Sequence, residues 1–143
     1  MAASEVRELS TTPQFRNAYP VLSQLRDHLT EETFLEQLDV MREDGYRLFA
    51  LFDEGDVVAV VGLVVRRNFF CDRHVFVEDL VTDEQHRGEG YGSRLLEYVH
   101  EFAREQSCSY VELESGLWRE EAHDFYENRG YEKLCYSFRR EVE

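Results

Sequence analysis

Lysine is nearly absent from this 143-residue sequence, in which Lys133 is the only one. Acidic residues outnumber basic ones by 30 to 16, which gives a net charge of −14. Such a field repels nucleic acid and no basic cluster offsets it, so the sequence excludes a nucleic-acid partner. The acidity either attracts a cationic substrate, such as a polyamine or a basic peptide, or is the solvated surface of a halophilic protein from a salt-rich cytoplasm. The scarcity of lysine favours salt adaptation.

Long apolar runs and closely spaced cysteines are also absent. No stretch approaches the ~20 residues that span a bilayer. The opening MAASEVREL has neither the basic nor the apolar region of a signal peptide. We therefore expect a cytoplasmic protein without membrane contact. Cys71, Cys108 and Cys135 form no CxxC pair and no zinc-like set with the five histidines, so we expect buried free thiols and no metal.

The composition that is present is globular, with 43% apolar and 13% aromatic residues, and its length suits one domain over 1–143. Alternating or apolar segments predict strands at 6–9, 46–52, 56–67, 73–82, 109–115 and 131–142. Helical periodicity predicts helices at about 12–29, 30–45, 91–106 and 119–130, with Thr12 and Thr30 as the first two N-caps. This order predicts a mixed α/β fold, in which helices flank a central, mostly antiparallel twisted sheet with one parallel strand–helix–strand unit.

The run QHRGEGYGSRLL places Gly88, Gly90 and Gly92 where a strand passes into a helix. Backbone N–H groups without side chains, beside the positive end of a helix dipole, form a site for phosphate or pyrophosphate. Arg87 and the Ser93 hydroxyl can add contacts. The Walker pattern fails because no lysine follows Gly92, and the Rossmann pattern fails because its third glycine falls at Ser93. A loop that needs positive φ for packing alone is the other interpretation.

Two segments resemble those of one enzyme family. Gln85–Gly90 resembles the Q/R-x-x-G-x-G/A signature of the GCN5-related N-acetyltransferases (GNAT), and Ala122–Tyr131 resembles their A-x-x-F-Y-x-x-x-G-F/Y segment. The resemblance covers roughly residues 57–142. It implies a GNAT-like fold, acetyl-CoA as co-substrate, no metal, and direct acetyl transfer to the primary amine of a small molecule or peptide. Dimers are frequent in the family, so a homodimer is an expectation. The alternative is a non-catalytic module on the same fold that senses acyl-CoA or nucleotide.

The resemblance also implies roles for single residues. Backbone groups of the preceding strand would meet the pantetheine arm of coenzyme A, with the Val81 amide on the thioester oxygen. The strand residues concerned are Leu80, Val81 and Thr82. The residues whose amides would hold the pyrophosphate are Arg87, Gly88, Glu89, Gly90, Tyr91, Gly92 and Ser93. An asparagine that bonds the pantetheine in relatives is replaced by Arg119, so that contact is not carried over.

Three side chains are candidates for proton transfer. Tyr126 matches the tyrosine that protonates the departing thiolate in relatives, although a tyrosine on a helix face also packs against a core. Glu78 and Asp79 interrupt an apolar strand, and alternation sends their side chains to opposite faces. One of them is expected to be buried, and the pair supplies either a base for the substrate amine or a structural carboxylate. The sequence leaves open which of the two is the base.

Overall fold

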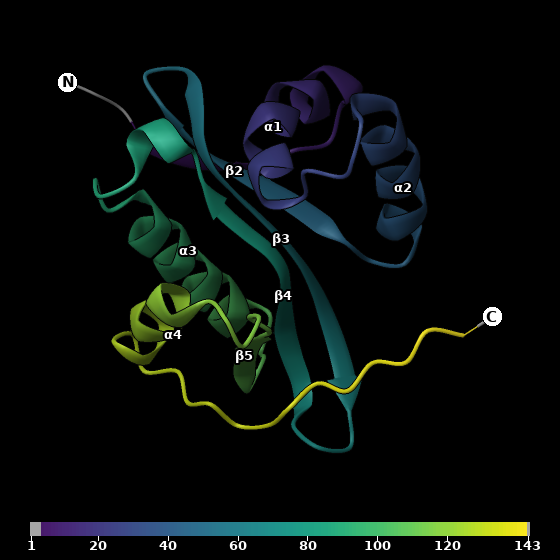
Figure 1. Ribbon diagram of the computed structural model, residues 1–143, viewed down its shortest axis with the longest axis vertical. Helices are drawn as coiled ribbons and strands as arrows, with labels where there is room; N and C mark the ends of the chain where they lie inside the picture. Colours follow the sequence, from purple (N-terminus) through teal and green to yellow (C-terminus); the bar gives the residue numbers. More distant parts are fainter. Residues whose placement is uncertain (1–3, 143) are drawn as a thin grey trace. The chain divides into compact units, whose positions relative to one another are not determined.

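The computed structural model describes residues 4–142 and contains a five-stranded sheet with the strand order β1-β2-β3-β4-β5 (Figure 1). The elements are β1 (Ser4–Glu8), α1 (Thr12–Leu25), α2 (Glu31–Glu43), β2 (Arg47–Asp53), β3 (Asp56–Asn68), β4 (Asp72–Thr82), the 3-10 turn η1 (Glu84–His86), α3 (Tyr91–Glu105), β5 (Tyr110–Leu113) and α4 (Glu120–Glu127). Strands β1 to β4 pair antiparallel in sequence order. The predicted mixed α/β fold with a mostly antiparallel sheet is therefore confirmed.

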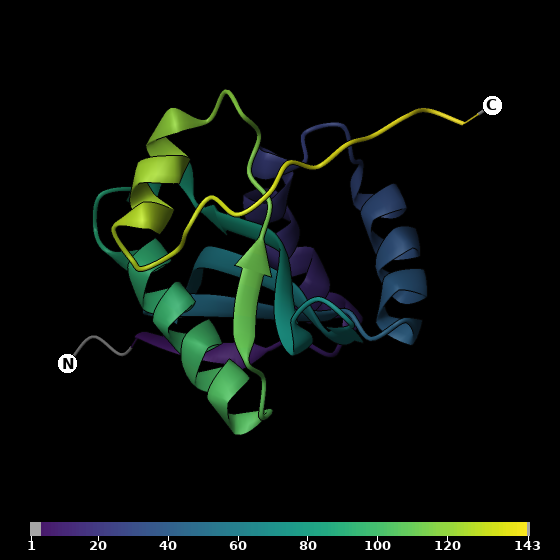
Figure 2. The same ribbon diagram turned by 90° about the horizontal axis from the view of Figure 1, so that it is seen from below.

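The chain forms two compact units, Met1–Glu112 and Leu113–Glu143. The first unit holds nearly the whole sheet. Figures 1 and 2 show α1 and α2 together on one face of strands β2 to β4 and α3 on the opposite face. The single domain expected over residues 1–143 stays a prediction. Among residues 4–142, no helix is both long enough and apolar enough to cross a membrane.

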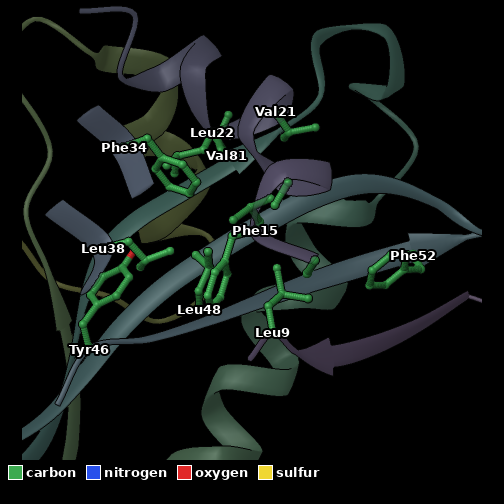
Figure 3. Close-up of a cluster of buried hydrophobic side chains, with 13 residues drawn as sticks. Leu9, Phe15, Val21, Leu22, Phe34, Leu38, Tyr46, Leu48, Phe52 and Val81 are labelled. Carbon is green, nitrogen blue, oxygen red and sulfur yellow. The ribbon is translucent and has the colours of Figure 1, made fainter. Parts of the chain in front are cut away.

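The core beneath α1 and α2 follows from the apolar stripes of these helices (Figure 3). Its largest members are Leu9, Phe15, Leu22, Phe34, Leu38, Tyr46, Leu48 and Phe52. Thr11, one residue before the predicted cap, begins α1 with a capping box in which its side chain accepts from the Gln14 N–H. Pro13 then lies within the first turn, where its missing N–H costs no helical hydrogen bond. Thr30 caps α2, as predicted.

The pairing of β3 with β4 contains a β-bulge. Gly62 lies opposite Asp79 and Leu63 lies opposite Val77, so Glu78 is an extra residue on β4. A bulge bends its strand and changes the direction of the extra side chain. Glu78 is exposed while Asp79 is buried, which confirms that one of the two carboxylates is buried. The bulge divides β4 into a hairpin half, Asp72–Val77, and a carboxyl half, Asp79–Thr82.

Two predictions are wrong. Residues 131–142 form no strand, although their side chains alternate, and Leu134, Tyr136 and Phe138 are exposed. Alternation becomes a strand only when the segment pairs with a sheet edge, and a single sequence cannot supply that information. The expectation of buried thiols holds for Cys71, whereas Cys108 is half-buried and Cys135 is exposed.

Candidate active site

The carboxyl half of β4 presents backbone donors on the side away from β3. The Asp83 N–H donates to the Val58 carbonyl over 2.8 Å, so these residues form a hydrogen-bonded pair of the ladder. Such pairs recur at every second residue, which directs the Val81 N–H toward β3 as well. The N–H groups of Leu80 and Thr82 therefore point away from β3.

Strand β5 does not cover these donors. The Ser109 N–H donates to the Arg73 carbonyl, near the start of β4, over 2.8 Å. From there β5, with four residues against eleven in β4, is too short to reach Leu80. This geometry revises the expectation for Val81: its side chain is buried in the core, and the outward donors belong to Leu80 and Thr82.

Asp83 fixes the loop that follows β4. Its carboxylate accepts hydrogen bonds from the Gln24 side chain (2.9 Å) and faces the His86 ring (Nδ1–Oδ2 2.8 Å). These hydrogen bonds, Gln24 first, hold the pKa of Asp83 below its ordinary value. The side-chain oxygen Oε1 of Gln24 in turn accepts a hydrogen bond from the Glu84 N–H over 2.8 Å. The sheet end, α1 and the loop are thus connected through a single carboxylate.

The glycine turn opens toward solvent. Gly88 and Gly90 have φ of +83° and +84°, a conformation in which a side chain is strained, and a Cβ at either would meet no atom within 4 Å. Glycine is therefore required here for backbone conformation, and the space above the turn is open. Gly92 lies inside α3, so only two of the three glycines serve the turn in this way.

The start of α3 has the geometry of an anion site. Its N-cap is Gly90, which offers no side chain, and the helical ladder begins only with the Arg94 N–H donating to the Gly90 carbonyl (3.0 Å). The preceding amides of the first turn have no intrahelical acceptor. The Tyr91 hydroxyl donates to Asp53, and this hydrogen bond raises the pKa of Tyr91 to about 12. The ring is thereby tied to the end of β2, while Arg87 remains exposed beside the turn.

The two acidic residues of β4 have different surroundings. Asp79 accepts from Arg26 Nε and from the Tyr46 hydroxyl, each over 2.8 Å, and its side chain is only 10% exposed. A second guanidinium nitrogen of Arg26 donates to the Glu78 carbonyl over 2.9 Å. Both Asp79 oxygens are therefore engaged within the protein, whereas the Glu78 side chain reaches solvent at the bulge.

Tyr46 reaches Asp79 across β3 because Gly62 leaves room. A Cβ built on Gly62 would lie 1.6 Å from the Tyr46 hydroxyl oxygen. Burial, followed by the adjacent Asp79 carboxylate, raises the pKa of Tyr46 well above its ordinary value. The phenol is thus a permanent donor, and it positions Asp79 on the face of the sheet beneath α1 and α2.

Known proteins resemble this chain in sequence and in fold. The sequence profile of the Acetyltransferase (GNAT) family matches residues 6–131. The chain belongs to the GNAT family. YhdJ, an uncharacterized N-acetyltransferase of Bacillus subtilis (strain 168), is 34% identical over 96% of this chain and 98% of its own. The aminoalkylphosphonate N-acetyltransferase of Salmonella typhimurium is 27% identical over 96% of this chain and 91% of its own length. The solved structure of an aminoglycoside N-acetyltransferase in complex with CoA superposes with a TM-score of 0.85 at 15% identity, covering 99% of this chain and 96% of that one.

The second GNAT segment lies in the second unit. Tyr126 is half-buried on α4, with its ring centroid 5.4 Å from that of Phe125 and 5.8 Å from that of Tyr131. Burial raises its pKa, so the phenol carries its proton at neutral pH. The structure brings together Glu78, Asp79, Leu80–Thr82 and Arg87–Ser93 in the first unit. The role of Tyr126 as an acid stays a prediction.

Sequence reasoning on this GNAT chain missed the partners of its carboxylates. Arg26 and Tyr46 lie 53 and 33 residues from Asp79, and no local pattern connects them. Spacing also missed a cluster of Cys71, His74 and Glu112, whose ligand atoms lie within 4.8 Å of one another. The signal that could have found it is the C-x-x-H spacing of Cys71 and His74, because the third member comes from a different strand.

Proposed function

We propose that this GNAT protein transfers the acetyl group of acetyl-CoA to a primary amine by direct attack. One observation carries the proposal: two groups of backbone donors flank the loop after β4, namely the outward N–H groups of Leu80 and Thr82 and the amides of the turn with Gly88 and Gly90 at the start of α3. A thioester linked to a pyrophosphate needs amide donors at one end and an anion site at the other. No side chain of special type is required in either group.

Each part of acetyl-CoA has a counterpart in the site. The pyrophosphate would bind the amides of Arg87–Ser93, with the exposed Arg87 guanidinium adding a charge-assisted contact. The pantetheine arm and the thioester oxygen would meet the outward N–H groups of Leu80 and Thr82. An aminoglycoside acetyltransferase that shares the fold has been solved in complex with CoA, which supports CoA as the ligand.

Glu78 is the better candidate for the base because it is exposed at the bulge, whereas Asp79 is buried against Arg26 and Tyr46. The substrate ammonium would lose a proton to the Glu78 carboxylate, directly or through water. The amine nitrogen would then attack the thioester carbon, and the C–S bond would break as the amide forms and the nitrogen releases its second proton to water. Tyr126 would give its proton to the departing thiolate and regain one from solvent. Asp79 acts as a positioning residue that holds Arg26 against the Glu78 carbonyl.

The acceptor we propose is the primary amine of a small molecule. The aminoalkylphosphonate acetyltransferase of Salmonella, alike over nearly its full length, bears the name of a small amine substrate. A homodimer and a cytoplasmic location are further proposals that rest on the family resemblance and the sequence.

The test is the release of free thiol from acetyl-CoA with a panel of small amines, polyamines and basic peptides, in buffer with and without molar KCl. An enzyme turns over with at least one amine. Turnover with none of them, combined with a rise in melting temperature on adding acetyl-CoA, would favour the non-catalytic sensor. No rise in melting temperature with acetyl-CoA, or a larger rise with ATP, would contradict the proposed CoA site.

A further inference from the structure

A second cluster of chemically active side chains lies at the hairpin half of β4. Cys71 precedes the strand, His74 lies on it and Glu112 lies on β5, and all three belong to the first unit. One ligand atom of each lies within 4.8 Å of those of the other two. His74 is completely buried, Cys71 is 8% exposed and Glu112 is half-buried. Thiolate, imidazole and carboxylate are the three ligand types that zinc binds in proteins.

The His74 ring is fixed in the orientation that a metal ligand needs. Its Nδ1 lies 2.8 Å from the Asp72 carbonyl oxygen, and a carbonyl only accepts, so Nδ1 carries the proton. Nε2 then presents its lone pair, 3.8 Å from the nearest Glu112 oxygen. A hydrogen bond from the second ring nitrogen to a carbonyl is the outer support that metal-binding histidines generally have.

The backbone around Cys71 is similarly fixed. The Cys71 N–H donates to the Asn68 side-chain oxygen over 2.9 Å, which closes the β3–β4 hairpin. Asp72 follows with φ of +59°, an uncommon conformation for a residue that is not glycine. Burial, followed by the nearby Glu112 carboxylate, raises the pKa of the Cys71 thiol.

A positive charge already borders the cluster. Arg66 Nε donates to His74 Nε2 over 3.2 Å, and its guanidinium lies 4.1 Å from the centroid of the Phe76 ring. The Arg66 residue is exposed, so its long side chain can withdraw into solvent. A metal ion and this guanidinium compete for the same imidazole lone pair.

We propose that Cys71, His74 and Glu112 form a binding site for a thiophilic divalent cation, zinc in the first place, with water as the fourth ligand. The site lies apart from the backbone donors of the carboxyl half of β4 and needs no acetyl-CoA. Binding would connect the β3–β4 hairpin to β5 through three side chains. Arg66 would act as a competitor that weakens the site.

The first experiment is a titration of the full chain with Co²⁺ as a spectroscopic probe, followed by displacement with Zn²⁺. We expect a thiolate-to-cobalt charge-transfer band at one equivalent, its loss on adding Zn²⁺, and a higher melting temperature with Zn²⁺. The Cys108→Ser/Cys135→Ser variant, which retains only Cys71, must keep the band. No band in this variant, or a band that follows Cys108 or Cys135, would overturn the proposal.

Variants then test each ligand and the competitor. Cys71→Ser should abolish the band, and Glu112→Gln should weaken Zn²⁺ binding at least as much as loss of an outer-shell partner does, by about 10-fold or more. Arg66→Gln should strengthen Zn²⁺ binding more than Arg67→Gln, which removes the same charge from the neighbouring exposed residue and would affect an adventitious surface site to a similar extent. Each melting temperature without metal shows whether the variant is folded. Unchanged affinity in both Glu112→Gln and Arg66→Gln would contradict the site as assigned.

Discussion

The two halves of β4 on either side of the bulge at Glu78 carry their chemistry in different ways. In the carboxyl half, Asp79–Thr82, the outward groups are backbone amides, and the following turn has glycines where side chains would be strained. At the hairpin half, Asp72–Val77, the cluster that includes His74 consists of side chains from β4, from the turn before it and from β5. A backbone site leaves its signal in a short run of sequence, whereas a side-chain site depends on which strands are paired.

The bulge at Glu78 separates these two kinds of site. At Glu78 the ladder to β3 gains an extra residue, and beyond it β5 no longer covers β4. Glu78 thus lies at the border between the covered and the uncovered half, with Arg26 held on its carbonyl. The proposed base at this border would reach the outward donors without interrupting the buried network around Asp79.

The largest effect is expected when each of the two carboxylates at this border is replaced, in turn, by the corresponding amide. Glu78→Gln should lower turnover by roughly 100-fold or more, because general-base catalysis is lost, while acetyl-CoA affinity stays unchanged. Asp79→Asn should mainly lower the melting temperature and reduce turnover much less, since it weakens the bonds to Arg26 and Tyr46. Steady-state thiol release and acetyl-CoA titration measure both. A larger rate loss in Asp79→Asn than in Glu78→Gln would reverse the two roles.

The buried side of the bulge should be sensitive to a single methyl group. Gly62→Ala places a Cβ within 1.6 Å of the Tyr46 hydroxyl, and overpacking of this kind costs about 1–3 kcal/mol of unfolding free energy. The Tyr46→Ala/Gly62→Ala double variant removes the clash, so adding Gly62→Ala to Tyr46→Ala should cost little. Denaturant unfolding of the four proteins completes the cycle. Equal costs of Gly62→Ala in both backgrounds would show that Tyr46 does not require the glycine.

The sequence predicted what depends on local patterns. The order of strands and helices up to α4, the Thr30 cap and the position of the glycine turn follow from periodicity and residue type and are observed, whereas the strand predicted at 131–142 is not. It did not predict the direction of the Val81 N–H. Backbone N–H groups along β4 point alternately toward and away from β3, and only the pairing of β4 with β3, seen in the hydrogen bond from the Asp83 N–H to the Val58 carbonyl, shows which of them point toward β3. Arg26 and Glu112 were missed for the same reason, because tertiary pairing alone brings them to Asp79 and His74.

The glycine turn provides a smaller effect. Gly90→Ala forces a Cβ into a φ of +84°, which costs about 1–2 kcal/mol, and should weaken acetyl-CoA binding because the first amides of α3 are displaced. Glu89→Ala, in the same exposed loop, is the matched control and should change neither property appreciably. Thermal melts with and without acetyl-CoA separate the two effects. If Gly90→Ala lowers stability but leaves the acetyl-CoA shift intact, the turn serves the fold alone.

The smallest effect concerns the Asp83 carboxylate that anchors the loop. The pKa of Asp83 is lower in the folded chain than in the unfolded chain. The ionised carboxylate therefore stabilises the folded chain at pH values above the ordinary aspartate pKa, and this stabilisation is lost as the pH falls through the pKa of Asp83 in the folded chain. Asp83→Asn should therefore cost about 1 kcal/mol at pH 7, the size of one hydrogen bond, and progressively less toward pH 3. Asp27→Asn, at an exposed aspartate just after α1, is the control and should follow the unmodified chain throughout. A constant difference between Asp83→Asn and the unmodified chain across this range would mean that the ionised carboxylate does not hold the loop, and that the order of the carboxyl half comes from the glycine turn alone.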